Sequence, residues 1–171
     1  MEPIDTVTLK GKEVLLKGDL PEVGEIAPDF TVVKRDLTEL SLFDIENRNK
    51  VILSLPSVDT KICAMESHKF SEALGKIENL DVICISKDLP FALKRFCEAE
   101  SLDNLISCSD FRYGDFGNEF NVEMVNGPLK GLLARAVVVL DKDNRIKYFE
   151  MVPEITREPD YDAALEAVNA L

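Results

Sequence analysis

The chain has 171 residues, of which 46% are hydrophobic, and its formal net charge at pH 7 is −12. A chain of this size fits one domain, residues 1–171, which can bury a full core without metals or disulfide staples. The acidic surplus excludes nucleic acids and anionic membranes as partners, because both require a basic surface. No apolar stretch approaches the roughly 18 residues that a membrane span needs.

The beginning of the chain and its cysteine content predict a cytoplasmic protein. Residues 1–7 contain two acidic side chains and no basic segment of the kind that opens a secretory leader. Four cysteines are few for a disulfide framework, and a reducing compartment would keep them as thiols unless turnover oxidises them. With no Cys-x-x-Cys pair and one histidine, His68, we predict neither a metal site nor a cofactor.

Apolar patterning predicts an α/β fold. Alternating runs at residues 6–10 and 13–17, joined by Gly11, indicate a β-hairpin within an extension of residues 1–18. Short strands are expected at 30–34 and 39–42. From Lys50 onward strands and helices alternate, which is typical of a central, partly parallel sheet flanked by helices. The expected strands are 51–55, 81–86, 105–108, 134–140 and 145–152, and the expected helices are 62–77, 91–100, 115–120 and 161–170.

The segment from Pro56 to Cys63 is the most informative for chemistry. Pro56 ends the preceding strand because it has no N–H for a central ladder. Thr60 is a good N-cap residue, which places Cys63 in the first turn of a helix. A helix N-terminus and a nearby cation can lower a thiol pKa from about 8.5 to below neutrality, and the thiolate is the nucleophile. Alternatively, Cys63 is a small buried hydrophobic residue at a helix start.

Two other polar residues bear on this site. Arg135 interrupts the apolar run 132–140, and a buried guanidinium needs an anion or several acceptors. It could instead snorkel from the strand end or pair with a structural carboxylate. His68 lies five positions after Cys63 and therefore on a different face of the helix, so we expect a surface residue rather than a catalytic base.

Here the chain resembles a known family. Pro56, Thr60 and Cys63 match the Pro-x-x-x-Thr-x-x-Cys motif of the peroxiredoxins. The rest of the chain is similar to the bacterial thiol peroxidase subgroup, which are atypical two-cysteine peroxiredoxins. The similar segments, in order and spacing, are 88–92 with 95–97, 127–132 with 134–136, and 158–161 with 163–165.

The resemblance implies a thioredoxin-like fold with the added hairpin, assembled as a homodimer. It implies that Cys63 is the peroxidatic cysteine, that Thr60 and Arg135 hold the thiolate and the peroxide, and that Pro56 shields the pocket. Cys97 is implied as the resolving cysteine of the same chain. Thioredoxin is the implied reductant, hydrogen peroxide and organic hydroperoxides are the substrates, and antioxidant defence is the role.

The chain departs from the family pattern at two positions. Glu66 follows Cys63 by three residues and would weaken the thiolate if it faced inward; we expect it to face solvent. Cys108 is additional and is expected to be structural, and Cys84 is expected to fill the core. From the residues alone, Cys97 stays open between a resolving thiol and helix packing.

The proposed chemistry is attack of the thiolate on a peroxide oxygen, followed by condensation of the sulfenic acid with a second thiol. A disulfide requires α-carbons about 5.5 Å apart, so a bridge between two helices predicts local unwinding of the first turn. Apolar Ile62, Met65 and Phe91 favour organic hydroperoxides. A redox sensor using the same cysteines without turnover stays open, whereas a disulfide exchange enzyme is disfavoured by the missing Cys-x-x-Cys.

Overall fold

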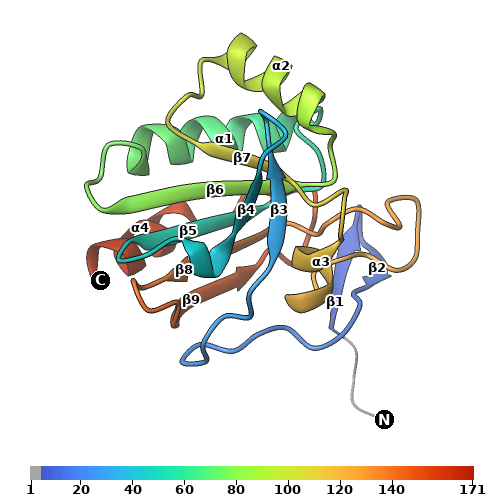
Figure 1. The fold of residues 1–171 in the computed structure, drawn as a ribbon. Helices are drawn as coiled ribbons and strands as arrows, with labels where there is room; N and C mark the ends of the chain where they lie inside the picture. The colour runs from blue at the N-terminus through green and yellow to red at the C-terminus, as the bar shows by residue number, and fades with distance from the viewer. Residues whose placement is uncertain (1–4) are drawn as a thin grey trace.

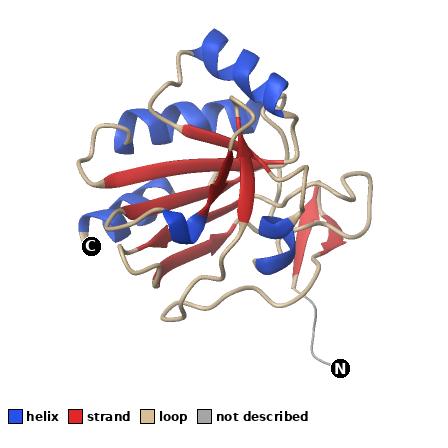
Figure 2. Ribbon diagram, in the orientation of Figure 1, coloured by secondary structure: helices blue, strands red, loops and turns tan. Residues whose placement is uncertain are grey.

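The computed structural model describes residues 5–171 and contains two sheets, four α-helices and one 3₁₀ turn (Figures 1 and 2). The first four residues of the predicted extension lie outside this range. The strands are β1 Thr6–Leu9, β2 Lys12–Leu15, β3 Thr31–Lys34, β4 Glu39–Ser41, β5 Asn49–Ser54, β6 Leu80–Ser86, β7 Ile106–Ser109, β8 Ala136–Leu140 and β9 Ile146–Met151. The helices are η1 Leu42–Asp44, α1 Lys61–Leu74, α2 Pro90–Glu100, α3 Asp115–Glu119 and α4 Tyr161–Asn169.

The large sheet is mixed, as predicted. Its strand order is β4-β3-β7-β6-β5-β8-β9, and β1 pairs only with β2. Strands β5, β6 and β7 are parallel, whereas β3, β4, β8 and β9 join their neighbours in antiparallel fashion. The helices α1 and α2 connect the three parallel strands, so the loops that begin both helices leave the same edge of the sheet.

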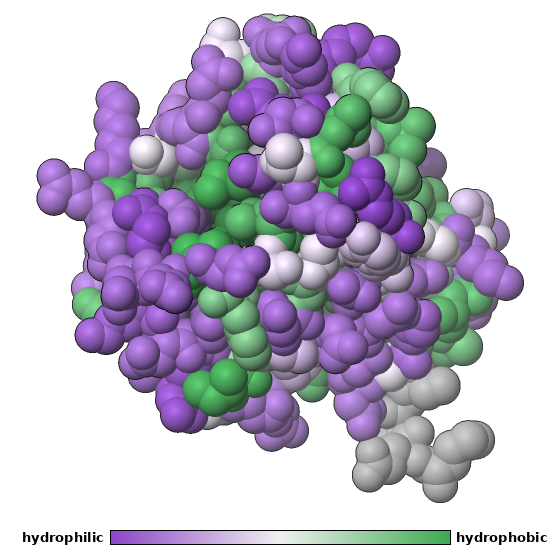
Figure 3. Space-filling view, in the orientation of Figure 1, coloured by the Kyte–Doolittle hydropathy of each residue, from purple (hydrophilic) through white to green (hydrophobic). Residues whose placement is uncertain are grey.

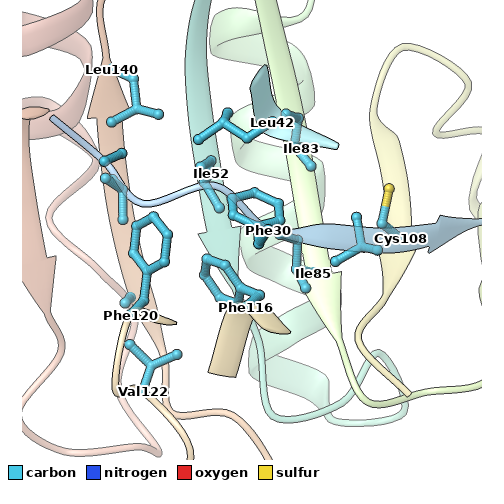
Figure 4. Packing of buried hydrophobic residues seen from close by; sticks show 14 of the residues in the cluster. Phe30, Leu42, Ile52, Ile83, Ile85, Cys108, Phe116, Phe120, Val122 and Leu140 are labelled. Atoms are coloured by element: carbon cyan, nitrogen blue, oxygen red, sulfur yellow. The ribbon is translucent and has the colours of Figure 1, made fainter. Parts of the chain in front are cut away.

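Side-chain alternation divides the core into two layers. In β5, Val51 and Leu53 pack with residues of α1, α2 and α4, whereas Ile52 points to the opposite layer. That second layer lies against α3 and holds the aromatic rings of Phe116 and Phe120 (Figure 4). The central strands β5, β6 and β8 are therefore covered on both faces, which explains their nearly continuous apolar sequences.

The N-terminal hairpin docks onto the segment that follows β9. Thr8 N–H donates to the Pro153 carbonyl at 2.7 Å, and Ile155 N–H donates to the Thr8 carbonyl at 2.9 Å. Val7 and Val14 are buried in a small separate cluster beneath the hairpin. The hairpin is thus fixed to the body of the protein at one specific place.

Among the predicted boundaries that were wrong by two or three residues, two bear on the site and its surroundings. The helix expected at 62–77 ends at Leu74, and Gly75 is its C-cap. A side chain at position 75 would clash with Asn104 and with the Ser71 carbonyl, so only glycine fits there. The strand expected at 134–140 begins at Ala136, which leaves Arg135 just before the ladder.

A carboxylate joins the loops that precede α1 and α2. Asp88 accepts hydrogen bonds from Ser57 Oγ at 2.8 Å, from Val58 N–H at 2.9 Å and from Ser86 Oγ at 2.8 Å. Ser57 and Val58 belong to the loop after β5, and Asp88 to the loop after β6. One side chain therefore holds the entry to α1 against the entry to α2.

We expect Asp88→Asn to lower the free energy of unfolding by about 1–3 kcal/mol, because an amide replaces a carboxylate that accepts three hydrogen bonds. Urea-induced unfolding measures the change. Asp59→Asn, in the loop after β5, is the matched control, since its exposed carboxylate accepts no hydrogen bond from residues 5–171. Equal stability of the two variants would contradict the role of Asp88 in joining the two loops.

Candidate active site

Cys63 lies in the first turn of α1, where the sequence placed it. Thr60 is the N-cap in extended conformation, and its Oγ accepts the hydrogen bond of Cys63 N–H at 3.2 Å. The Thr60 hydroxyl donates its own hydrogen to the Ser57 carbonyl at 3.1 Å. Thr60 Oγ therefore keeps one lone pair and can act toward a ligand only as an acceptor. No acidic residue occupies the first turn of α1 to offset its positive end.

Arg135 contacts Cys63 from the position just before β8, the strand that pairs with β5. It is 1% exposed and shares the side-chain alternation of Val137 and Val139, which face α1. Its Nη1 donates to Cys63 Sγ at 3.2 Å, and Nε and Nη2 both donate to the Ile155 carbonyl at 3.1 Å. Burial lowers the pKa of Arg135, but the nearby Cys63 and the carboxylate described next raise it more, so the guanidinium stays charged.

The expectation that Glu66 faces solvent was wrong. Glu66 is fully buried, and Arg135 Nη1 donates to its Oε2 at 2.7 Å. A spacing of three residues puts Glu66 on the same helix face as Cys63, and that face points at the cation. Burial raises the pKa of Glu66 to about 7, against the lowering effect of Arg135. Arg135 thus binds both the cysteine that the resemblance implied and a carboxylate, which was the alternative partner.

A cavity of about 290 Å³ opens beside this cluster. Pro56, Thr60 and Arg135, all singled out from the sequence, line it together. Arg135 also touches Cys63, so it connects the cavity with the buried sulfur. The remaining walls are largely apolar and come from four regions of the chain: Leu9, Ser57, Lys61, Ile62, Leu129, Leu132, Ile155 and Thr156.

The composition of these walls corrects one prediction and adds residues that the sequence did not reveal. Ile62 lines the cavity as expected, but Met65 and Phe91 do not. Phe91 lies at the start of α2 with 68% of its surface exposed. Leu9 was missed because nothing near β1 in the sequence indicates that the hairpin docks beside Ile155.

The four cysteines are all free and buried, but they lie on two sides of the sheet. Cys84 and Cys97 share the core layer of Cys63, whereas Cys108 belongs to the opposite layer (Figure 4). Burial raises the pKa of Cys84 well above its ordinary value and that of Cys108 to about 12, so both stay thiols at neutral pH. Cys97 Sγ lies 3.1 Å from Ser107 Oγ.

His68 is exposed, as predicted, and its Nε2 lies 2.7 Å from Glu100 Oε2 on the surface. Within residues 5–171, no three His, Cys, Asp or Glu side chains are grouped so that they could hold a metal ion. None of the helices in that range is long and apolar enough to span a bilayer.

Known proteins share this fold and sequence over nearly the full chain. The family model described as Redoxin matches residues 22–165. A thiol peroxidase of Leptospira interrogans is 46% identical over 166 residues, which cover 96% of this chain and 97% of the relative. A thiol peroxidase of Corynebacterium glutamicum is 47% identical over 160 residues, covering 94% and 96%. The solved structure of a peroxiredoxin-like protein from Aquifex aeolicus superimposes with a TM-score of 0.92 at 43% identity, covering 96% of both chains.

These similarities agree with the site. The thioredoxin-like fold and the peroxiredoxin resemblance that the sequence predicted are both confirmed, and the enzyme is a peroxidase of this type. The chain therefore belongs to the redoxin family and, within it, to the thiol peroxidases among the peroxiredoxins.

Proposed function

We propose that this thiol peroxidase reduces hydrogen peroxide and organic hydroperoxides through Cys63 and Cys97 and is recycled by thioredoxin in antioxidant defence. One observation carries the proposal: a buried cation, Arg135, donates to Cys63 Sγ at a helix N-terminus and also lines an adjoining cavity. A positive helix end and a guanidinium both favour the thiolate over the thiol.

The oxidation step is a displacement on oxygen. The Cys63 thiolate forms a bond to one peroxide oxygen, the O–O bond breaks, and the other oxygen leaves with the electron pair and is protonated to water or an alcohol. Thr60 Oγ would accept the hydrogen bond of the peroxide O–H, since its own hydrogen is held by Ser57. Arg135 has one Nη2–H without a partner among residues 5–171, which would stabilise charge on the leaving oxygen.

Cys97 is the proposed resolving thiol. It shares the core layer of Cys63, whereas the sheet separates Cys108 from that layer. Cys84 lies in the central strand β6, which is hydrogen-bonded on both sides and cannot shift without breaking the sheet. Cys97 Sγ would displace water from the Cys63 sulfenic acid to form the disulfide, and the dithiol of thioredoxin would then reduce it by exchange.

Disulfide formation requires a local rearrangement. Cys63 and Cys97 both have no exposed surface, and each lies within a formed helix. Cys63 must give up the cap hydrogen bond from its N–H to Thr60 and the contact with Arg135 before its sulfur can meet Cys97. The first turn of α1 is therefore the segment that we expect to unwind in the oxidised enzyme.

We expect Cys63→Ser to abolish peroxide consumption and Cys97→Ser to allow one stoichiometric oxidation without cycling. A steady-state assay with peroxide, thioredoxin, thioredoxin reductase and NADPH measures both. Cys108→Ser is the matched control and should cycle like the wild type, because this thiol lies across the sheet. Normal cycling of Cys97→Ser would rule out its role, and a wild type that oxidises once without cycling would identify a redox sensor instead.

The cavity walls favour substrates with an apolar group. Leu9, Leu129, Leu132 and Ile155 contribute apolar side chains to the cavity wall. An alkyl or aryl substituent of a hydroperoxide would displace water from these side chains, whereas hydrogen peroxide has nothing to bury there.

We expect Leu9→Asn to lower kcat/KM for cumene hydroperoxide by about tenfold, the size typical of a lost apolar pocket contact, and to leave kcat/KM for hydrogen peroxide within about twofold. The comparison of the two substrates removes effects on the cysteines themselves. Val23→Asn, a substitution of an exposed apolar residue outside the cavity, should change neither. A parallel loss for both substrates would show that Leu9 only stabilises the fold.

The resemblance also implies a homodimer, and one exposed surface suits it. Leu89 and Phe91 follow β6, Phe111 and Tyr113 follow β7, and all four are large and exposed. The two loops leave adjacent parallel strands, and Figure 3 shows apolar surface at the N-terminal end of α2. Exposed apolar residues grouped in this way are typical of a protein interface. We propose that they form the dimer contact.

We expect Phe91→Asp to shift the molar mass in sedimentation equilibrium from dimer to monomer, because the interface would bury an unpaired charge. Phe43→Asp replaces a similarly exposed ring on η1 and should leave the dimer intact. A monomeric wild type would exclude the dimer, and a dimeric Phe91→Asp variant would place the contact elsewhere.

We further place the enzyme in the cytoplasm. Four cysteines are few for a disulfide framework, and a reducing compartment supplies the reduced thioredoxin that the proposed cycle requires. The net charge of −12 argues against nucleic acids and anionic membranes as partners.

A further inference from the structure

Arg135 Nη1 has two acceptors that compete for the same positive charge. It lies 3.2 Å from Cys63 Sγ and 2.7 Å from Glu66 Oε2, and all three side chains are buried. One guanidinium balances one negative charge. A thiolate and a carboxylate together would leave the buried cluster with an uncompensated anion, which is strongly unfavourable away from water.

The surroundings of Glu66 offer nothing else that would stabilise a second negative charge. Its Oε1 is buried and has no hydrogen-bond partner among residues 5–171, which suits a protonated oxygen better than an ionised one. The titratable and charged groups around it from every packed element are Cys63 on α1, Cys84 on β6, Arg135 before β8, Glu150 on β9, Glu158 before α4 and Tyr161 on α4. Of these only Arg135 is a cation, and Lys69 is already paired with Glu158 at 3.1 Å.

We propose that Glu66 shares one proton with Cys63, so that these two side chains together carry a single negative charge opposite Arg135 at every stage of turnover. This rests on the proposed role of Cys63 as the attacking thiol. When Cys63 ionises, its proton passes to the Glu66 carboxylate, which gives a thiolate and a neutral carboxylic acid. No electrons are transferred in this step, and the total charge of the three side chains does not change.

The same proton is released when the thiolate is consumed. Attack converts the Cys63 thiolate into a neutral sulfenic acid, and Glu66 then ionises to balance Arg135. The reaction is Cys63–S⁻ plus Glu66–COOH plus ROOH giving Cys63–SOH plus Glu66–COO⁻ plus ROH. The Glu66 proton thus ends on the leaving oxygen, and both atoms and charge balance. Arg135 keeps a counterion even after Cys63 leaves the site for Cys97.

Proton counting tests this proposal. Reduced enzyme is mixed with one equivalent of hydrogen peroxide in weak buffer near pH 7, and a pH indicator records protons taken up per Cys63 oxidised. The wild type should take up none, whereas Glu66→Gln should take up about one, because the hydroxide that leaves must then be neutralised from solvent. Glu72→Gln, an exposed glutamate on the same helix, should behave like the wild type. Equal uptake by the wild type and Glu66→Gln would overturn the proposal.

A second measurement needs no change at Glu66. The infrared difference spectrum between reduced and oxidised wild type should show a carboxylic acid C=O band that is present in the reduced enzyme and lost on oxidation. No such loss would also overturn the proposal. Failure of the underlying function is distinguishable: if Cys63→Ser still consumes peroxide, the assignment of Cys63 is wrong. If Cys63→Ser is inactive but the proton counts of wild type and Glu66→Gln are equal, only the role of Glu66 fails.

Discussion

The hydrogen bonds of one buried guanidinium, that of Arg135, hold the active site together. Arg135 binds Cys63 and Glu66 on α1 and the Ile155 carbonyl after β9. Segments far apart in the sequence are fixed to one another because an unpaired buried cation is far less stable than a paired one. Ile155 also bonds to Thr8, so the position of the hairpin is set by the same segment.

The sheet supplies the geometry that this cation requires. Parallel strands β5, β6 and β7 end at one edge, which brings the start of α1 and the start of α2 side by side, and Asp88 joins them. The register pairs Ser54 with Ala136, so Arg135 emerges just where β5 gives way to the loop before Cys63. A shift by one residue would turn Arg135 to the other core layer. The chemistry therefore depends on strand pairing as much as on the motif.

Much of this site can be predicted from the sequence, and the parts that cannot be predicted have physical causes. The N-cap of Thr60 and the place of Cys63 in the first turn follow from local rules, which need no tertiary information. The burial of Glu66 does not, because a carboxylate on a helix is exposed unless something elsewhere requires it. The clue was present: Arg135 needed an anion, and Glu66 shared a helix face with Cys63. The place of Leu9 in the cavity wall could not be predicted, because the hairpin docks through contacts between residues more than a hundred positions apart in the sequence.

The second anion gives a physical reason why this enzyme can open its active site during each cycle. If Cys63 were the only anionic partner of Arg135, its oxidation and movement toward Cys97 would leave a buried cation without a counterion and would oppose disulfide formation. Glu66 is on the same helix but one turn further along, beyond the segment that must unwind. Its carboxylate can stay with Arg135 while the first turn is released. The Glu66 carboxylic acid is neutral while the thiolate is present and becomes the counterion of Arg135 after oxidation, which couples the rearrangement of α1 to the oxidation state of the sulfur.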